Sequence, residues 1–227
     1  MIGFLKQNGK IILITLALRI GDKYGPEYET YLNSKIDVTW IREPFSPKVL
    51  LQWNKMIGMT LDTNDPICVI DIDILLLNDY MDLFNYPIKP GQFIGIPSWW
   101  GDTEDPSYTI NGGFYKYFPK DCRYIYEKFV KDPQYWQEFY IKNETTIGPV
   151  NGEQYFVEDS VKENLELITV PPSWVCRMAE EGKFEREEKY KEITGNEYMY
   201  LGDFHPDIKL AHYTHSLNKV KSDFHYI

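Results

Sequence analysis

Short apolar runs rich in β-branched residues alternate along this chain with amphipathic segments of helix length. Such alternation is typical of an α/β sheet with helices packed on its faces. We therefore predict strands over residues 10–18, 36–40, 66–71, 92–97 and 165–170, and helices over residues 25–32, 48–61, 120–131 and 152–163. The charged segment 179–193 is expected to be a solvated helix or a lid. The expected class is α/β, with a mixed, mostly parallel central sheet flanked by helices.

Length and charge limit what such a chain can do. The 227 residues, 43% of them hydrophobic, are enough for one substantial core, so we predict a single domain over residues 1–227. The 24 basic and 34 acidic residues give a net charge of −10 without a long basic cluster. A polyanion-binding surface needs the opposite balance, so nucleic acid is not an expected partner.

Cysteine usage and the apolar segments indicate a compartment. Cys68, Cys122 and Cys176 lie far apart and show no metal-ligand spacing, which favours a reducing environment. Segment 11–20 is about half the length of a membrane span, contains Arg19 and lacks a cleavage site after it. We therefore expect a first β-strand there, no transmembrane segment and a cytoplasmic protein.

The segment ICVIDIDILLL, residues 67–77, places Asp71 and Asp73 inside an apolar run. In an extended chain, residues two apart point to the same side, so both carboxylates face one way. They would lie at the carboxyl end of a buried strand, where open α/β sheets bind their ligands. Two hard oxygen ligands there suit a divalent cation that also binds a diphosphate. The alternative is a pair of aspartates that cap the turn after the strand.

This pattern resembles the metal-binding DxD motif of glycosyltransferases with the GT-A fold, a Rossmann-like fold whose members transfer sugars from nucleotide diphosphates. In that family a basic residue on the preceding helix contacts the donor, and Lys55 in VLLQWNKMIGM matches it. Downstream, TINGGFYKY resembles the element beside the donor sugar, which implies that Asn111 binds the sugar and that Gly112 and Gly113 let the backbone approach it. Without the resemblance, Lys55 would be an exposed helix lysine and Asn-Gly-Gly a turn between strands.

Two further elements complete the resemblance. GPVNGEQYFVED is similar to the helix start of retaining enzymes, which implies that Glu153 and Gln154 face the reaction centre. The residues alone equally fit a capping box, in which Gln154 reaches back to Asn151. KLAHYTHSLNK resembles the element with the third metal ligand, which implies His212 in that role and Lys219 as a diphosphate contact. An imidazole among oxygen ligands favours Mn²⁺, with Mg²⁺ as the other candidate.

The last segment departs from the family pattern in two ways. His215 stands where those families often have glycine, and Lys219 is displaced by one residue. His215 is therefore a rival ligand.

The remaining candidate contacts concern the nucleotide and the acceptor. The first βα connection implies weaker nucleotide contacts, at Thr15, Ala17, Arg19 and Tyr24, within a nucleotide-binding half at about residues 1–110. Trp99 and Trp100 in PSWWGD are weak candidates for an acceptor platform, because aromatic faces suit sugar rings. The acceptor-side half is expected at about residues 111–227.

In particular, the chain resembles the small glycosyltransferase domains that chlorella viruses encode for capsid glycans, as the N-terminal domain of a larger polypeptide. That likeness implies a UDP-sugar donor, a glycan or glycoprotein acceptor, manganese and the host cytoplasm. It favours retention, with Gln154 or Glu153 under the sugar; for inversion, Glu153, Asp159 or Asp203 would serve as general base. The alternative functions are a non-catalytic, metal-dependent carbohydrate-binding module and a sugar nucleotidyltransferase.

Overall fold

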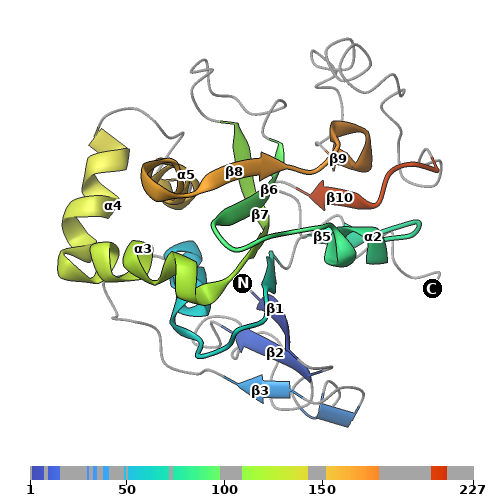
Figure 1. Cartoon of the computed structure of the whole chain (residues 1–227), viewed down its shortest axis with the longest axis horizontal. Helices are drawn as coiled ribbons and strands as arrows, with labels where there is room; N and C mark the ends of the chain where they lie inside the picture. Colours follow the sequence, from blue (N-terminus) through green and yellow to red (C-terminus); the bar gives the residue numbers. More distant parts are fainter. Residues whose placement is uncertain are drawn as a thin grey trace.

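The computed structural model describes residues 2–7, 10–15, 30, 33–34, 38–40, 49, 51–71, 74–97, 109–142, 152–178 and 206–213. Within these residues the chain folds into strands and helices that form a mixed α/β structure (Figure 1). No helix of the described part is long and apolar enough to cross a membrane.

The central sheet has the strand order β4–β7–β6–β8. Its strands are β4 (Ile67–Ile70), β6 (Gln92–Pro97), β7 (Ile110–Tyr117) and β8 (Glu166–Thr169). β7 runs antiparallel to both of its neighbours, β4 and β6, whereas β8 is parallel to β6. β7 is therefore a central strand, and its first residues can be reached from elements on both faces of the sheet.

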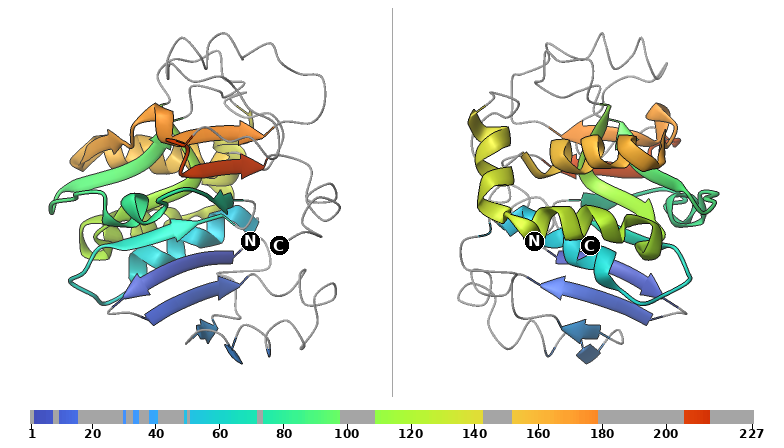
Figure 2. Two further views of the ribbon diagram at one scale, coloured as in Figure 1. Left: turned by 90° about the vertical axis from the view of Figure 1, so that its right-hand side faces the viewer. Right: turned by 60° about the vertical axis from the view of Figure 1, so that its left-hand side comes forward.

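Two smaller sheets lie beside the central one. In the first, β10 (Leu210–Tyr213) pairs antiparallel with β5 (Ile74–Leu76) and parallel with β9 (Val175–Met178). In the second, β2 (Lys10–Thr15) pairs antiparallel with β1 (Ile2–Gln7) and parallel with β3 (Val38–Trp40). β1 also lies beside β4, as both views in Figure 2 show.

The longer helices lie on one side of the central sheet, away from β5, β9 and β10 (Figure 1). They are the 3₁₀ helix η1 (Leu51–Thr60) and the α-helices α3 (Pro119–Lys131), α4 (Pro133–Lys142) and α5 (Gly152–Asn164). Two short helices, α2 (Met81–Asn85) and η2 (Pro172–Trp174), complete the described elements.

Local sequence explains where α3 begins and ends. Pro119 occupies its first turn, where the missing N–H costs nothing, and Lys131 lies in its last turn, where a cation faces the negative end of the helix. Asp132 then ends α3, and its carboxylate accepts a hydrogen bond from the Tyr135 N–H at 2.9 Å, which caps the start of α4. One aspartate thus separates two helices.

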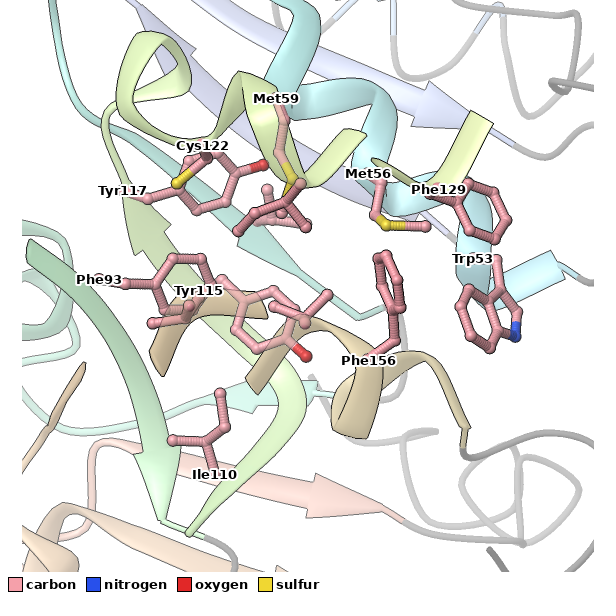
Figure 3. Packing of buried hydrophobic residues seen from close by; sticks show 14 of the residues in the cluster. Trp53, Met56, Met59, Phe93, Ile110, Tyr115, Tyr117, Cys122, Phe129 and Phe156 are labelled. Atoms are coloured by element: carbon pink, nitrogen blue, oxygen red, sulfur yellow. The ribbon is translucent and has the colours of Figure 1, made fainter. Parts of the chain in front are cut away.

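An aromatic core fills the space between the helices and the central sheet. Trp53 of η1 stacks on Phe129 of α3 with ring centroids 5.0 Å apart, and Phe156 of α5 lies 5.7 Å from Trp53 (Figure 3). Ile67 and Val69 of β4 join this core, while Cys68 and Ile70 join a second cluster on the opposite face. β4 is buried on both faces, which is why it appears in the sequence as a continuous apolar run.

The structure confirms most of the predicted elements and corrects others. The predicted strands over 66–71, 92–97 and 165–170 correspond to β4, β6 and β8, and the helices over 120–131 and 152–163 correspond to α3 and α5. The helix over 48–61 is a 3₁₀ helix. The mixed, mostly parallel α/β class is confirmed, because β4, β6 and β8 of the central sheet run in one direction and β7 runs opposite to them. Segment 179–193 and most of 25–32 lie outside the described residues.

Candidate functional site

The first residues of β7 form an irregular segment in the middle of the central sheet. Asn111 pairs with Ile96 of β6, whereas Tyr115 pairs with the adjacent Gly95, so three residues of β7 bulge out between two paired positions. Within the bulge the Asn111 Oδ1 accepts a hydrogen bond from the Gly113 N–H at 2.9 Å. The Asn-Gly-Gly sequence therefore lies inside a strand, and its interpretation as a turn between strands is wrong.

Lys55 of η1 reaches this bulge and binds it through its ammonium group. The Nζ donates a hydrogen bond to the Gly112 carbonyl at 2.7 Å and lies 3.1 Å and 3.2 Å from the two carboxylate oxygens of Asp71. It also lies 3.2 Å from Oε2 of Glu153. Burial by itself would lower the pKa of Lys55, but the two carboxylates together raise it above its usual value. Lys55 is buried, so the alternative of an exposed helix lysine is excluded.

Glu153 in the first turn of α5 closes the far side of the same cluster. Its Oε1 accepts a hydrogen bond from the Tyr115 hydroxyl at 3.3 Å, and its Oε2 faces Lys55. Burial raises the pKa of the Glu153 carboxyl to about 7, and the repulsion from Asp71 adds to the rise while Lys55 opposes it. Burial and the charge of Glu153 also raise the pKa of Tyr115 well above its usual value.

Gly112 has both of its backbone polar groups bound by side chains. Its N–H donates to the Gln154 Oε1 at 3.1 Å, and its carbonyl accepts from Lys55. A β-carbon at this position would lie 3.1 Å from Oε2 of Glu153, 3.1 Å from Nζ of Lys55 and 3.2 Å from the Tyr115 hydroxyl. Only glycine fits this cluster without displacing it. Gln154 thus makes a tertiary contact with β7, and its proposed cap partner Asn151 lies outside the described residues.

A second anchor for β7, which sequence reasoning missed, is Glu158 of α5. Its Oε1 accepts hydrogen bonds from the Thr109 N–H at 2.7 Å and the Thr109 hydroxyl at 2.9 Å, and its Oε2 accepts from the Ile110 N–H at 3.0 Å. Lys162 forms an ion pair with it on the next turn. The signal that could have found Glu158 is its spacing of four residues from Gln154, which puts both on one helical face.

His212 lies on the other side of the bulge. It belongs to β10, where it pairs with Ile74 of β5, and its side chain is buried. A β-carbon on Gly113 would lie 3.2 Å from the Cε1 atom of His212, and the Gly113 carbonyl accepts a hydrogen bond from the Asp71 N–H at 2.9 Å. Asp71 and His212 therefore both border Gly113.

The residues that could hold a metal ion are only partly described. The backbone N–H of Asp71 and the imidazole of His212 border Gly113, and a carboxylate and an imidazole are ligand types that suit manganese. Asp73, the other expected ligand, lies outside the described residues. Among the residues that are described, no group of three or more His, Cys, Asp or Glu side chains could hold a metal.

The other candidate residues fall outside this cluster. Thr15 ends β2. The candidates beyond the described residues are Ala17, Arg19, Tyr24, Trp99, Trp100, Asp203, His215 and Lys219. Asp159, considered as a general base, accepts a hydrogen bond from the Tyr140 hydroxyl of α4 at 2.6 Å. Its carboxylate therefore faces α4 and not the β7 bulge.

No family model and no curated protein matches the sequence. Solved structures do match: the glycosyltransferase GlyE of Streptococcus pneumoniae TIGR4 aligns with 84% of this chain at a TM-score of 0.56 and 14% identity. Its apo form aligns with 84% of the chain at a TM-score of 0.54 and 13% identity. This chain has a glycosyltransferase fold.

The chain spans less than half of the GlyE structures, 45% and 44% of their lengths. Mouse xyloside xylosyltransferase 1 in its apo form also aligns, over 85% of this chain and 80% of that one, at 12% identity. Its TM-score of 0.49 is too low to support an argument. The expected GT-A fold class is confirmed. Asp71 directly follows β4, a buried strand of the central sheet.

Proposed function

We propose that this chain is a metal-dependent glycosyltransferase that transfers a sugar from a UDP-sugar to a glycan or glycoprotein acceptor. The observation that carries the proposal is the convergence of four elements on the β7 bulge. Lys55, Asp71 and Gln154 reach the bulge from η1, the end of β4 and α5, and His212 borders it from β10. A bulge whose backbone is held by the side chains of Lys55 and Gln154 and by the backbone N–H of Asp71 is what a positioned reaction centre needs.

Each residue has a role in this proposal. Asp71, Asp73 and His212 would hold the cation, Mn²⁺ by preference, and once bound it would neutralise charge that develops on the leaving diphosphate. Asn111 has its oxygen bonded to Gly113, so its amide nitrogen is the group we assign to a donor-sugar hydroxyl. Gly112 gives the sugar close access to the backbone.

We assign the position under the sugar to Gln154, whose amide is oriented by the Gly112 N–H, and we propose retention of the anomeric configuration. An oriented amide dipole at that place would stabilise a positively charged sugar in the transition state.

The rest of the donor and acceptor sites rests on the sequence resemblance alone. Nucleotide contacts are proposed at Thr15, Ala17, Arg19 and Tyr24, a diphosphate contact at Lys219, and an acceptor platform at Trp99 and Trp100. The proposed biological role, also from the resemblance, is synthesis of viral glycoprotein glycans in the host cytoplasm.

The test measures by chromatography how much UDP the protein releases from each of a panel of UDP-sugars, in reactions with and without Mn²⁺. We expect Mn²⁺-dependent release with at least one donor, and expect Gln154→Ala to slow it strongly while nucleotide binding persists. NMR of the liberated sugar should show the anomeric configuration of the donor. An inverted anomer would overturn retention, and no release from any donor would argue against the enzyme.

A further inference from the structure

A single ammonium group lies between two carboxylates beside the β7 bulge. The Lys55 Nζ is 3.1 Å from Asp71 and 3.2 Å from Glu153, and it also holds the Gly112 carbonyl at 2.7 Å. Either carboxylate alone would neutralise the ammonium. The second one costs desolvation and repulsion between like charges, so its presence requires an explanation.

The two carboxylates differ in what can reach them. The side chain of Asp71 is 16% exposed and follows the open end of β4, whereas that of Glu153 is 3% exposed. The Tyr115 hydroxyl and the Lys55 ammonium occupy the two oxygens of Glu153, and Gly112 lies against Oε2. A ligand can approach Asp71, but the surroundings of Glu153 are filled by protein.

From this asymmetry we infer that Glu153 is a positioning residue: it is the second counter-ion that keeps Lys55 paired when Asp71 engages a divalent cation. The inference rests on the proposed function, in which Asp71 is a metal ligand. Lys55 and the cation attract the same carboxylate and therefore compete for it. With Glu153 present, Lys55 stays neutralised and keeps its hydrogen bond to Gly112 while Asp71 turns its charge to the cation.

The consequence of removing Glu153 follows from the cost of a buried, unpaired charge. In a Glu153→Gln variant, Lys55 would have Asp71 as its only carboxylate partner in the cluster. Cation binding at Asp71 would then leave a buried ammonium without a counter-ion, which is strongly unfavourable. Deleting Lys55 together with Glu153 removes both the competitor and that penalty.

The same geometry argues against direct chemistry by Glu153. A nucleophile or general base must reach the reacting atoms, whereas both oxygens of this carboxylate are engaged behind Gly112. If Glu153 were a nucleophile or a general base, Glu153→Gln would lower the activity but leave nucleotide affinity unchanged. Deletion of Lys55 would then not restore the activity. The two roles therefore predict different binding data.

The experiment is calorimetric titration of UDP at pH 8, where the Glu153 carboxyl is ionised, with and without Mn²⁺ into wild type, Glu153→Gln, Glu153→Asp and the double variant Lys55→Met/Glu153→Gln. We expect Glu153→Gln to weaken Mn²⁺-dependent UDP binding by about tenfold or more. Glu153→Asp, which keeps the charge, should recover part of this loss. The double variant should bind UDP more tightly than Glu153→Gln does, because the effects of residues in contact are not additive.

A control variant and a second measurement show whether the effect on UDP binding is specific to Glu153. Glu163→Gln is the matched control, because it makes the same change on α5 at an exposed ion pair with Lys128 and should leave affinity unchanged. Thermal unfolding of the metal-free proteins is a second readout: Lys55→Met alone should lower the Tm more than the double variant, since it leaves the buried Glu153 and the partly buried Asp71 without their ammonium.

The titrations distinguish a failure of the counter-ion role of Glu153 from a failure of the proposed glycosyltransferase function. If wild type binds UDP with Mn²⁺ and Glu153→Gln binds equally well, the counter-ion role is wrong and the proposed function stands. A double variant that binds no better than Glu153→Gln would also overturn the role. If wild type itself shows no Mn²⁺-dependent binding, both proposals fall together.

Discussion

At the scale of single residues, Gly112 is the position where the site tolerates least change. Gly112→Ala would bring a β-carbon to 3.1 Å from both Lys55 and Glu153. We expect a loss of about 1–3 kcal/mol in the free energy of unfolding, because the polar groups around it are fixed by hydrogen bonds. Nucleotide affinity should fall as well, measured by calorimetry.

The control for this change is Gly91→Ala. A β-carbon there meets nothing within 4 Å, so the cost is only that of its positive φ of +82°. It should destabilise the fold without changing nucleotide affinity. Equal affinity losses in the two variants would mean that Gly112 acts through stability alone.

Glu153 gives the chain a pH dependence of unusual sign. Its pKa is raised from 4.5 to about 7 in the folded chain, so the folded state holds a proton that the unfolded state has already released. The free energy of unfolding should therefore fall as pH rises from about 4.5 to 7, and Glu153 should add no further change above that range. The shift corresponds to about 3 kcal/mol.

Urea unfolding of wild type and Glu153→Gln at pH 5 and pH 8 measures this effect, because the other titrating groups are common to both proteins. We expect the variant to gain stability relative to wild type at the higher pH. A stability difference that is the same at both pH values would contradict the assignment.

At the scale of elements, α5 orients the start of β7. Glu158 accepts three hydrogen bonds from Thr109 and Ile110 and is fully buried. Glu158→Ala would leave these donors without acceptors, at a cost of about 3–5 kcal/mol, whereas Glu158→Gln keeps one oxygen and should cost less. Chemical denaturation checks both values, with Glu163→Gln as the control on the same helix.

A Glu158 variant also tests whether nucleotide binding requires Glu158 to hold the bulge in place. If the bulge must be held in place, Glu158→Gln will weaken UDP binding although Glu158 lies outside the proposed donor site. An unchanged affinity in a folded Glu158→Gln protein would show that the bulge keeps its shape without this anchor.

The sequence predicted elements well where the pattern was local. β4 was recognisable because it is buried on both faces and therefore continuously apolar, and α3 because its buried residues recur with helical spacing. α4 was not among the predicted helices; it begins at Pro133, and proline is well accommodated in a first helical turn. β5 was missed because three residues carry too little pattern.

In the candidate site, the sequence likewise predicted individual residues but not their contacts. Lys55, Asp71, Asn111, Gly112 and Gln154 were proposed from motifs, and the structure brings them together. Their mutual contacts could not be predicted, because a buried lysine shared by two carboxylates depends on the packing of η1 against α5. Glu158 was missed for the same reason, since its partners are backbone groups of another element.

At the scale of the whole molecule, the aromatic core and the site share α5. Phe156 packs against Trp53 and Phe129 (Figure 3). Its ring centroid also lies 5.1 Å from that of Trp136. Phe156→Leu should therefore destabilise the fold by about 1–3 kcal/mol through lost packing. Below its melting temperature the variant should bind nucleotide as wild type does; weaker binding would show that core packing sets the position of Gln154.

The central claim is that the end of β4 and the β7 bulge form a metal-dependent nucleotide site. Its most direct test is calorimetric titration of UDP into the metal-free protein, with and without Mn²⁺, for wild type and Asp73→Asn. The account predicts binding that requires both Mn²⁺ and Asp73. Absence of binding to wild type under every condition, or equal binding by Asp73→Asn, would contradict it.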